Sequence, residues 1–439
     1  MKTIDEKKTY SAEEVLRKRK EFLLPCVSHY YDAPPHIVQG KGQFLYDEKG
    51  KEYLDFFAGV VTVNSGHCNP EIAEKIIQQV KTLQHTTTLY LTSPMVDLAE
   101  KLAQIAPGDL NKSFICNSGT EANEGAALLS KLHTGSHEFI ALRNSFHGRS
   151  IMGMSFTGQH NWRVGNPYVF GVNFISSAYC YRCSYGQTYP SCDLVCARDL
   201  ENIIRTCTSL KVAAMIAEPI QGNGGVIVPP PEYFKVIKEI LDKYGILLIS
   251  DEVQTGFGRT GDKWFGIEHW GVVPDMMTLA KGMGNGLAIG GFITTSKVAS
   301  SIKTGQHFST FGGNPISCVG ALANIEYIEK ENLAKNARVV GNYLMDGLGE
   351  LKKKHALIGD VRGKGLMIGI ELVKEKKAPA TAEMKKVMEI CKDRGVLIGK
   401  GGLDGNVIRL KPPLIINKSD ADRALKVLDE ALTKVEKGS

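Results

Sequence analysis

The chain has 439 residues, with 53 lysines and arginines against 47 aspartates and glutamates and a formal net charge of +6. Hydrophobic residues make up 43% and charged residues 23%, which is typical of a globular protein and argues against disorder, coiled coil and collagen. The small net charge does not indicate a nucleic-acid-binding surface. No apolar run reaches the roughly 18 residues that a membrane span needs.

Residues 1–25 alternate charges of both signs and contain no apolar stretch like that of a secretory signal peptide. Asp5, Glu6, Glu13 and Glu14 argue against a mitochondrial transit peptide, which is poor in acidic residues. We interpret this segment as an exposed amphipathic helix that leads into the fold. Ten cysteines without a secretory signal are typical of reduced thiols, so the sequence predicts a cytoplasmic protein.

The next segments predict a hairpin, a capped helix and then an alternating pattern. Residues 42–56 predict two short strands joined by a turn, and Asn69 followed by Pro70 predicts a helix start. Short apolar runs then alternate with helical segments, at residues 112–116, 138–142, 212–217, 246–250, 276–280 and 290–295. This alternation predicts an α/β fold with a mostly parallel central sheet that is buried on both faces.

After Pro315 the pattern changes to long amphipathic helices with a few strands, at residues 366–372, 396–399 and 407–413. This change predicts a smaller α+β domain at the C-terminus. We therefore expect an N-terminal segment with a small hairpin (1–60), a large domain (61–315) and a small C-terminal domain (316–439).

Polar residues follow the predicted strands, at the sheet edge where ligands of open α/β sheets bind. Ser118, Gly119 and Thr120 follow one strand and precede a helix that we expect to start near Ala122. Hydroxyls and free backbone amides there suit a phosphate, although a plain helix cap gives the same pattern. Phe146 and His147 follow the next strand and place an aromatic ring and an imidazole on the same edge.

A carboxylate and a lysine follow two further strands. Asp251 ends one strand, and Lys281 follows another. The two residues could form a structural ion pair. Alternatively, Lys281 forms an imine with an aldehyde cofactor while Asp251 keeps a heterocyclic nitrogen protonated. The imine lysine, the carboxylate, the aromatic ring and the phosphate cradle together are what pyridoxal 5'-phosphate requires.

Residues 256–261 match the dinucleotide-binding pattern GxGxxG, which is a competing signal. That fingerprint needs the first glycine directly after a strand and a helix opening at the third. Here residues 251–255 intervene and no helical periodicity follows, so the context argues against a nucleotide-binding module.

The chain resembles the class III, or ω-amino-acid, aminotransferases of fold type I from about Gly40 to Ala431. The matching motifs are residues 66–70, 117–123, 145–148, 218–222, 251–261, 275–284, 310–315 and 362–366, and Arg409 with the PPL that follows it. Within this family, residues 306–315 and 359–372 are most similar to the second type of alanine:glyoxylate aminotransferase.

The resemblance implies roles for individual residues. It implies that Lys281 holds the cofactor and moves a proton, and that Asp251 holds the pyridine nitrogen protonated. The cofactor contacts that it implies are Ser118, Gly119, Thr120, Phe146, His147, Glu218, Val253 and Gln254, with Gln254 reaching the phenolic oxygen. Thr310 would reach the phosphate of the neighbouring subunit, which implies a homodimer with shared active sites, or a tetramer built from it. Arg409 would bind the substrate carboxylate.

One departure from the family pattern bears on the substrate. The 4-aminobutyrate and ornithine branches have a glutamate at the position of Asn223, where it pairs with the arginine. Asn223 cannot neutralise Arg409, which favours alanine or β-alanine as donor and glyoxylate or pyruvate as acceptor. A transaminase that passes an ω-amine to 2-oxoglutarate, and a lyase or racemase on the same scaffold, remain alternatives.

Four cysteines lie between the strand near Val172 and a helix expected to start near Asp199. They are Cys180, Cys183, Cys192 and Cys196. Their spacing is that of a small zinc loop, although a loop of free thiols is the alternative. The aminotransferase chemistry does not need such a metal.

Overall fold

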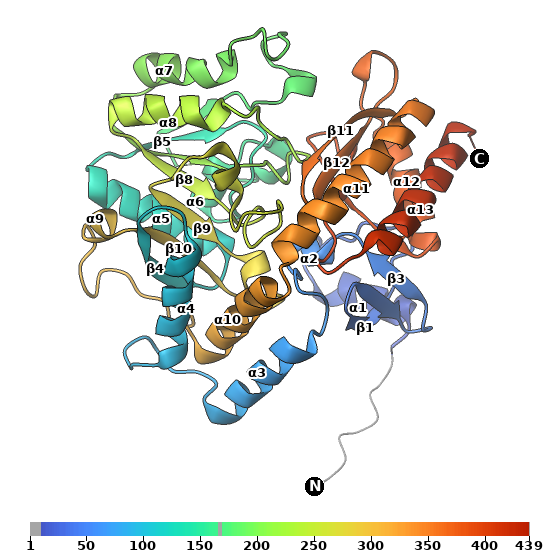
Figure 1. Cartoon of the computed structure of the whole chain (residues 1–439), viewed down its shortest axis with the longest axis horizontal. Helices are drawn as coiled ribbons and strands as arrows, with labels where there is room; N and C mark the ends of the chain where they lie inside the picture. The colour runs from blue at the N-terminus through green and yellow to red at the C-terminus, as the bar shows by residue number, and fades with distance from the viewer. Residues whose placement is uncertain (1–9, 166–168, 439) are drawn as a thin grey trace.

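The computed structural model describes residues 10–165 and 169–438, so Asp5 and Glu6 lie outside the described residues. Two regions lie side by side in Figure 1, a large one around a central sheet and a smaller one that combines strands β1–β3 (residues 37–55) with the C-terminal part of the described chain. No helix in the described ranges is long and apolar enough to cross a membrane.

The central sheet has seven strands. In spatial order they are β4 (Leu110–Cys116), β10 (Gly290–Thr295), β9 (Met276–Leu279), β8 (Leu247–Asp251), β7 (Val212–Ala217), β5 (Glu138–Leu142) and β6 (Val172–Ile175). Only β10 runs against its neighbours. The prediction of a mostly parallel sheet is therefore confirmed.

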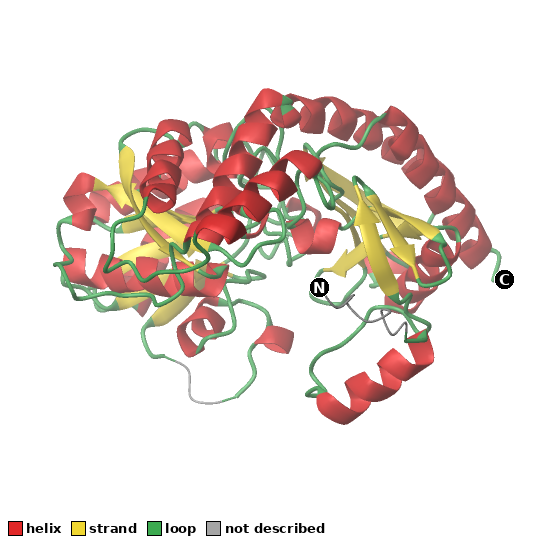
Figure 2. Ribbon diagram, turned by 90° about the horizontal axis from the view of Figure 1, so that it is seen from below, coloured by secondary structure: helices red, strands yellow, loops and turns green. Residues whose placement is uncertain are grey.

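Helices cover this sheet on both faces, as Figure 2 shows. They are α4 (Ser93–Ile105), α5 (Gly119–Thr134), α6 (Ile151–Phe156), α7 (Val195–Cys207), α8 (Tyr233–Tyr244), α9 (Ser296–Ala299) and α10 (Pro315–Lys330). Every residue of β7, β8 and β9 is buried, which explains why these strands are mostly apolar rather than alternating.

Two helices precede this core. The exposed lead-in helix is α1 (Ala12–Phe22), which contributes no buried residue. The helix predicted at Asn69 is α3 (Pro70–Thr82), and the Asn69 side chain accepts hydrogen bonds from the amides of Glu71 and Ile72. A short helical turn, α2 (Ala58–Val61), lies between them.

The smaller region combines two four-stranded sheets. One is antiparallel and contains β11 (Ile358–Lys364), β12 (Met367–Leu372), β15 (Val407–Leu410) and β14 (Gly399–Gly401). The other contains β1 (Ile37–Lys41), β2 (Phe44–Asp47), β3 (Glu52–Asp55) and β13 (Val396–Leu397). The helices α11 (Leu333–Lys354) and α12 (Thr381–Asp393) pack on these sheets, and α13 (Lys418–Glu436) packs against both of these helices.

The structure corrects one predicted strand. Residues 396–399 were expected to form a single strand, but the chain divides there between β13, which pairs with β3, and β14, which pairs with β15. The predicted hairpin at residues 42–56 is consequently one half of a sheet whose last strand comes from the C-terminal part. The domain boundaries at residues 60 and 315 stay a prediction.

Candidate active site

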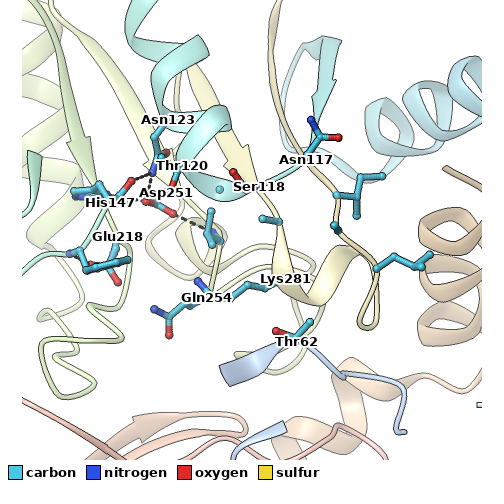
Figure 3. A pocket seen from close by; sticks show the side chains of 18 residues that line it. Thr62, Asn117, Ser118, Thr120, Asn123, His147, Glu218, Asp251, Gln254 and Lys281 are labelled. Carbon is cyan, nitrogen blue, oxygen red and sulfur yellow. Dashed lines mark hydrogen bonds and ion pairs between the residues drawn. The ribbon is translucent and has the colours of Figure 1, made fainter. Parts of the chain in front are cut away.

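A cavity of about 290 Å³ opens at the carboxyl ends of the central strands. Figure 3 shows its wall, to which seven separate segments of the chain contribute residues. The structure brings ten of the predicted residues together here: Ser118, Gly119, Thr120, Phe146, His147, Glu218, Asp251, Val253, Gln254 and Lys281. Thr62, Asn117 and Asn123 also line it and were missed.

The N-terminus of α5 forms one wall of the cavity. The helix begins at Gly119 rather than near Ala122, because the Ser118 hydroxyl caps it and accepts a hydrogen bond from the amide of Glu121. The amides of Gly119 and Thr120 therefore belong to the first turn, where no helical carbonyl is available to them. A β-carbon at Gly119 would lie 2.9 Å from the Val253 side chain, so glycine is needed here. Such a turn suits a phosphate.

Asp251 lies at the end of β8 and is 3% exposed. Its Oδ2 accepts hydrogen bonds from His147 Nδ1 at 2.7 Å and from Asn123 Nδ2 at 3.0 Å. Burial alone would raise the pKa of Asp251, but the His147 and Asn123 hydrogen bonds outweigh it, so the pKa is lowered. Asp251 is therefore held as an anion facing the cavity, which is what a protonated ring nitrogen requires.

Lys281 follows β9 and has a positive φ of 45°, which is strained for a residue with a side chain. Burial lowers the pKa of Lys281, and the charge of Arg409 lowers it further, while Asp251 and Glu218 act in the opposite direction. A lowered pKa makes the amine easier to deprotonate and thus more nucleophilic. The lysine and carboxylate of the predicted pair consequently face one cavity.

Glu218 links two segments of the wall. Its Oε1 accepts a hydrogen bond from the amide of Phe146 at 3.0 Å, and its Oε2 accepts one from the amide of Gly222 at 2.8 Å. Burial raises the pKa of Glu218. These bonds fix the backbone that carries the Phe146 ring, which also packs edge-on against Trp162.

Arg409 and Asn223 meet in an adjoining cavity of about 770 Å³. Arg409 Nη1 donates to the Gly222 carbonyl and to Asn223 Oδ1, both at a long 3.4 Å. Its Nε is buried and has no hydrogen-bond partner among the described residues. Burial lowers the pKa of Arg409, yet the guanidinium keeps free donors.

Thr310 does not line the cavity of its own chain. It is exposed and lines a different hollow, which also includes Asn117 and Thr120 on the outer side of the α5 N-terminus. Two neighbouring aromatic side chains, Phe308 and Phe311, are 51% and 63% exposed.

The structure does not support the predicted zinc site. Helix α7 begins at Val195 instead of near Asp199, so Cys196 lies in its first turn, whereas Cys180 lies in a separate 3₁₀ turn. Burial raises the pKa of Cys196 to about 11, and the nearby Cys180 and Cys192 contribute to the increase. Within residues 10–165 and 169–438, no three His, Cys, Asp or Glu side chains gather to hold a metal.

The glycine-rich residues 256–261 serve the packing of the fold. No helix opens at Gly261, and the Arg259 side chain is fully buried. Its guanidinium donates to Asn64 Oδ1 at 2.6 Å and to the Leu366 carbonyl at 3.0 Å. This segment is therefore not a dinucleotide-binding turn.

The cavity fits pyridoxal 5'-phosphate in its chemistry. It combines a helix N-terminus that a β-carbon would block, a buried carboxylate, an aromatic ring and a lysine with a lowered pKa. The side chain of Asn123, which reaches Asp251 from α5, completes this set. The motif at residues 117–123 contained that residue, but sequence alone did not reveal its partner.

Comparison with known proteins agrees with this chemistry. The family described as "Aminotransferase class-III" matches residues 27–432. An Arabidopsis thaliana protein, "Alanine--glyoxylate aminotransferase 2 homolog 2, mitochondrial", is 45% identical over 97% of this chain and 88% of its own. A "Leucine/methionine racemase" of Thermococcus litoralis is 39% identical over 97% of this chain and 96% of its own. A solved Bacillus anthracis aminotransferase superimposes with a TM-score of 0.90 at 33% identity, over 96% of this chain and 98% of that one.

Proposed function

This chain belongs to the class-III aminotransferases, which work with pyridoxal 5'-phosphate, and we propose that it passes an amino group from alanine or β-alanine to glyoxylate or pyruvate. Membership of the family makes it an enzyme that acts on amino acids and 2-oxo acids. The identity of those substrates is the proposal. The similarity to an alanine--glyoxylate aminotransferase homologue supports it.

The observation that carries the proposal is the unmatched charge of Arg409. It donates long hydrogen bonds of 3.4 Å to two neutral oxygens and interacts with the Tyr30 side chain, and no carboxylate is hydrogen-bonded to it among the described residues. A substrate carboxylate would supply the missing partner through charge-assisted hydrogen bonds. Asn223 carries an uncharged amide, so it cannot neutralise the charge of Arg409 as a glutamate would. Substrates that keep a carboxylate on Arg409 in both half-reactions are therefore favoured.

The remaining site residues have separate tasks in this proposal. When bound, pyridoxal 5'-phosphate draws electrons away from the substrate carbon that loses its proton. Lys281 holds the cofactor and then carries that proton, for which its lowered pKa suits it. Asp251 holds a positive charge at the ring nitrogen, and the first turn of α5 binds the phosphate. Phe146 and Val253 cover the two ring faces, and His147 keeps Asp251 ionised.

A panel of donors and acceptors tests the proposal. Purified enzyme with added cofactor is given alanine, β-alanine, 4-aminobutyrate or ornithine, each with glyoxylate, pyruvate or 2-oxoglutarate. We expect the highest kcat/KM with alanine or β-alanine and a small 2-oxo acid. A clear preference for 4-aminobutyrate with 2-oxoglutarate would overturn the substrate proposal and leave the family assignment intact.

A racemase is the second candidate, because the Thermococcus litoralis relative with that name covers nearly the whole chain. Both activities would use Lys281 and Asp251, and only the face on which the proton returns distinguishes them. Incubating L-leucine or L-methionine with the enzyme in the absence of any 2-oxo acid separates the two. Loss of optical rotation without keto-acid formation would favour the racemase.

We also propose a homodimer that shares its active sites. Support comes from the position of Thr310, which is exposed and outside its own cavity, and from the exposed Phe308 and Phe311 beside it. Mixing Lys281→Ala subunits with Thr310→Ala subunits tests this. In a hybrid dimer one site carries both changes and the other carries neither, so activity should reappear on mixing. A monomer in light scattering, or no recovery after mixing, would contradict it.

The cytoplasmic location is a further part of the proposal and rests on the mixed charge of the N-terminal residues. The Arabidopsis thaliana relative carries "mitochondrial" in its name, so the two locations must be compared directly. Cell fractionation of the tagged full-length protein distinguishes them.

A further inference from the structure

Lys411 is a buried lysine that the family motifs do not account for. It directly follows β15 and lies two positions after Arg409, so both side chains point to the same face of the strand. Lys411 is fully buried, and its backbone amide donates to the Phe56 carbonyl at 2.8 Å. The strand end is thereby fixed, and the side chain extends toward the cofactor cavity.

A buried ammonium group needs acceptors, since its transfer from water is costly. The acceptor for Lys411 Nζ among the described residues is Gln254 Oε1, at 2.8 Å. Burial lowers the pKa of Lys411, the charges of Arg409, Lys281 and Arg259 lower it further, and Glu218 acts in the opposite direction. No carboxylate is hydrogen-bonded to Lys411 in the described part of the chain. A buried lysine in that position is hard to explain by stability alone.

Gln254 has little freedom at this position. It is 7% exposed and lines the cofactor cavity. A β-carbon at Gly222 would lie 2.4 Å from Gln254 Oε1, so the backbone at Gly222 closes one side of the amide. A side-chain amide has one accepting oxygen and one donating nitrogen, and either can face a neighbour unless something selects the orientation.

Lys411 supplies that selection, because its Nζ donates the 2.8 Å hydrogen bond to Gln254 Oε1. The amide oxygen of Gln254 must then face Lys411, and the amide nitrogen is left to donate elsewhere. We propose that Lys411 is a positioning residue that turns the Gln254 amide so that Nε2 donates to the phenolic oxygen of bound pyridoxal 5'-phosphate. This inference rests on the proposed function. It explains why a lysine is buried beside two other cations of the site.

With this orientation, the Gln254 N–H would stabilise the deprotonated phenolic oxygen of the bound cofactor. The opposite orientation would place the amide oxygen there, which repels the anion. Lys411→Met removes the cation at similar length and frees the amide to rotate. Gln254→Glu keeps a partner for Lys411 but presents no N–H to the cofactor. Lys392→Met is the matched control, because Lys392 is also a buried lysine but is paired with Glu389 and Asp393 outside the cavity.

The test uses the visible and near-ultraviolet absorbance of the holoenzyme together with the cofactor dissociation constant. We expect Lys411→Met and Gln254→Glu each to shift absorbance from the visible band to the near-ultraviolet band of the protonated phenol. Cofactor binding should weaken about tenfold, equivalent to about 1.4 kcal/mol. The control should keep the wild-type spectrum and affinity. Because replacing a buried charge by an apolar side chain of similar size is often neutral or stabilising, apo Lys411→Met should keep its thermal stability.

Two results would overturn the inference. One is a Lys411→Met protein with the wild-type spectrum and cofactor affinity, whatever its stability. The other is a Gln254→Glu protein with the wild-type spectrum, which also covers the case in which Lys411→Met does not fold. Failure of the proposed function is distinct, because it would show as a different donor and acceptor preference of the wild-type protein, whereas this test compares the spectra and cofactor affinities of variants.

Discussion

Replacing Arg409 by glutamine should separate substrates by whether they carry a carboxylate. Among the described residues the guanidinium makes two long hydrogen bonds of 3.4 Å and interacts with the Tyr30 side chain, while its buried Nε has no partner, so it retains donors for a ligand. One charge-assisted hydrogen bond contributes roughly 1.5–3 kcal/mol. At 1.36 kcal/mol per factor of ten, Arg409→Gln should lower kcat/KM for alanine and for glyoxylate by about 10- to 150-fold.

The assay compares that loss with the loss for a primary amine that has no carboxylate, measured on the same protein preparation. For this amine we expect less than about a threefold change, since no hydrogen bond to Arg409 is lost. Asn223→Glu tests the opposite change. The new glutamate would pair with Arg409 in the absence of a substrate carboxylate, so kcat/KM for such an amine should rise relative to kcat/KM for alanine. Equal losses for both kinds of substrate in Arg409→Gln would refute the carboxylate-binding role and make Arg409 a structural residue.

The other predictions concern chemistry and pH. Lys281→Ala should abolish turnover while thermal unfolding changes little, and near-normal turnover would contradict its role. Asp251→Asn should reduce kcat at least about a hundredfold, because an amide cannot hold a ring proton, whereas unfolding should change by no more than about 3 kcal/mol. Burial and nearby lysines lower the pKa of His269 to about 4, below the usual value near 6.5, so the unfolded chain takes up a proton first as pH falls. Stability should then decrease by roughly 2 kcal/mol between pH 6.5 and pH 4, and His269→Gln should remove that decrease in denaturant titrations at each pH.

The large sheet could be predicted from sequence because each of its strands is marked by a short continuous run of apolar residues. Strands buried on both faces are nearly all apolar, as in β7 and the first part of β8, and the residues at their carboxyl ends must gather at one edge. The order of strands and polar residues in the sequence is therefore enough to place Lys281 and Asp251 at this edge. The start of α5 was misplaced by three residues, since a serine cap and a serine in a helix look alike in sequence.

What could not be predicted depends on contacts between distant segments. Asn123 on α5 reaches Asp251 on β8, and Lys411 reaches Gln254 across the boundary between the two regions. Neither pair leaves a signal in spacing or composition. The division of residues 396–399 between two sheets is of the same kind, because it is decided by which partner strands are nearby.

The pairing of β3 with β13 has a consequence for how the chain folds during its synthesis. Leu54 is opposite Val396, so the N-terminal sheet stays incomplete until nearly the whole chain has left the ribosome. At about 5–20 residues per second, the roughly 340 intervening residues take on the order of 20–70 s to be made. During that time β3 presents an open strand edge, which is a template for pairing with other nascent chains. Expression of chains truncated before residue 396 should therefore give aggregated protein, and the intact protein should benefit from chaperones that bind early N-terminal segments.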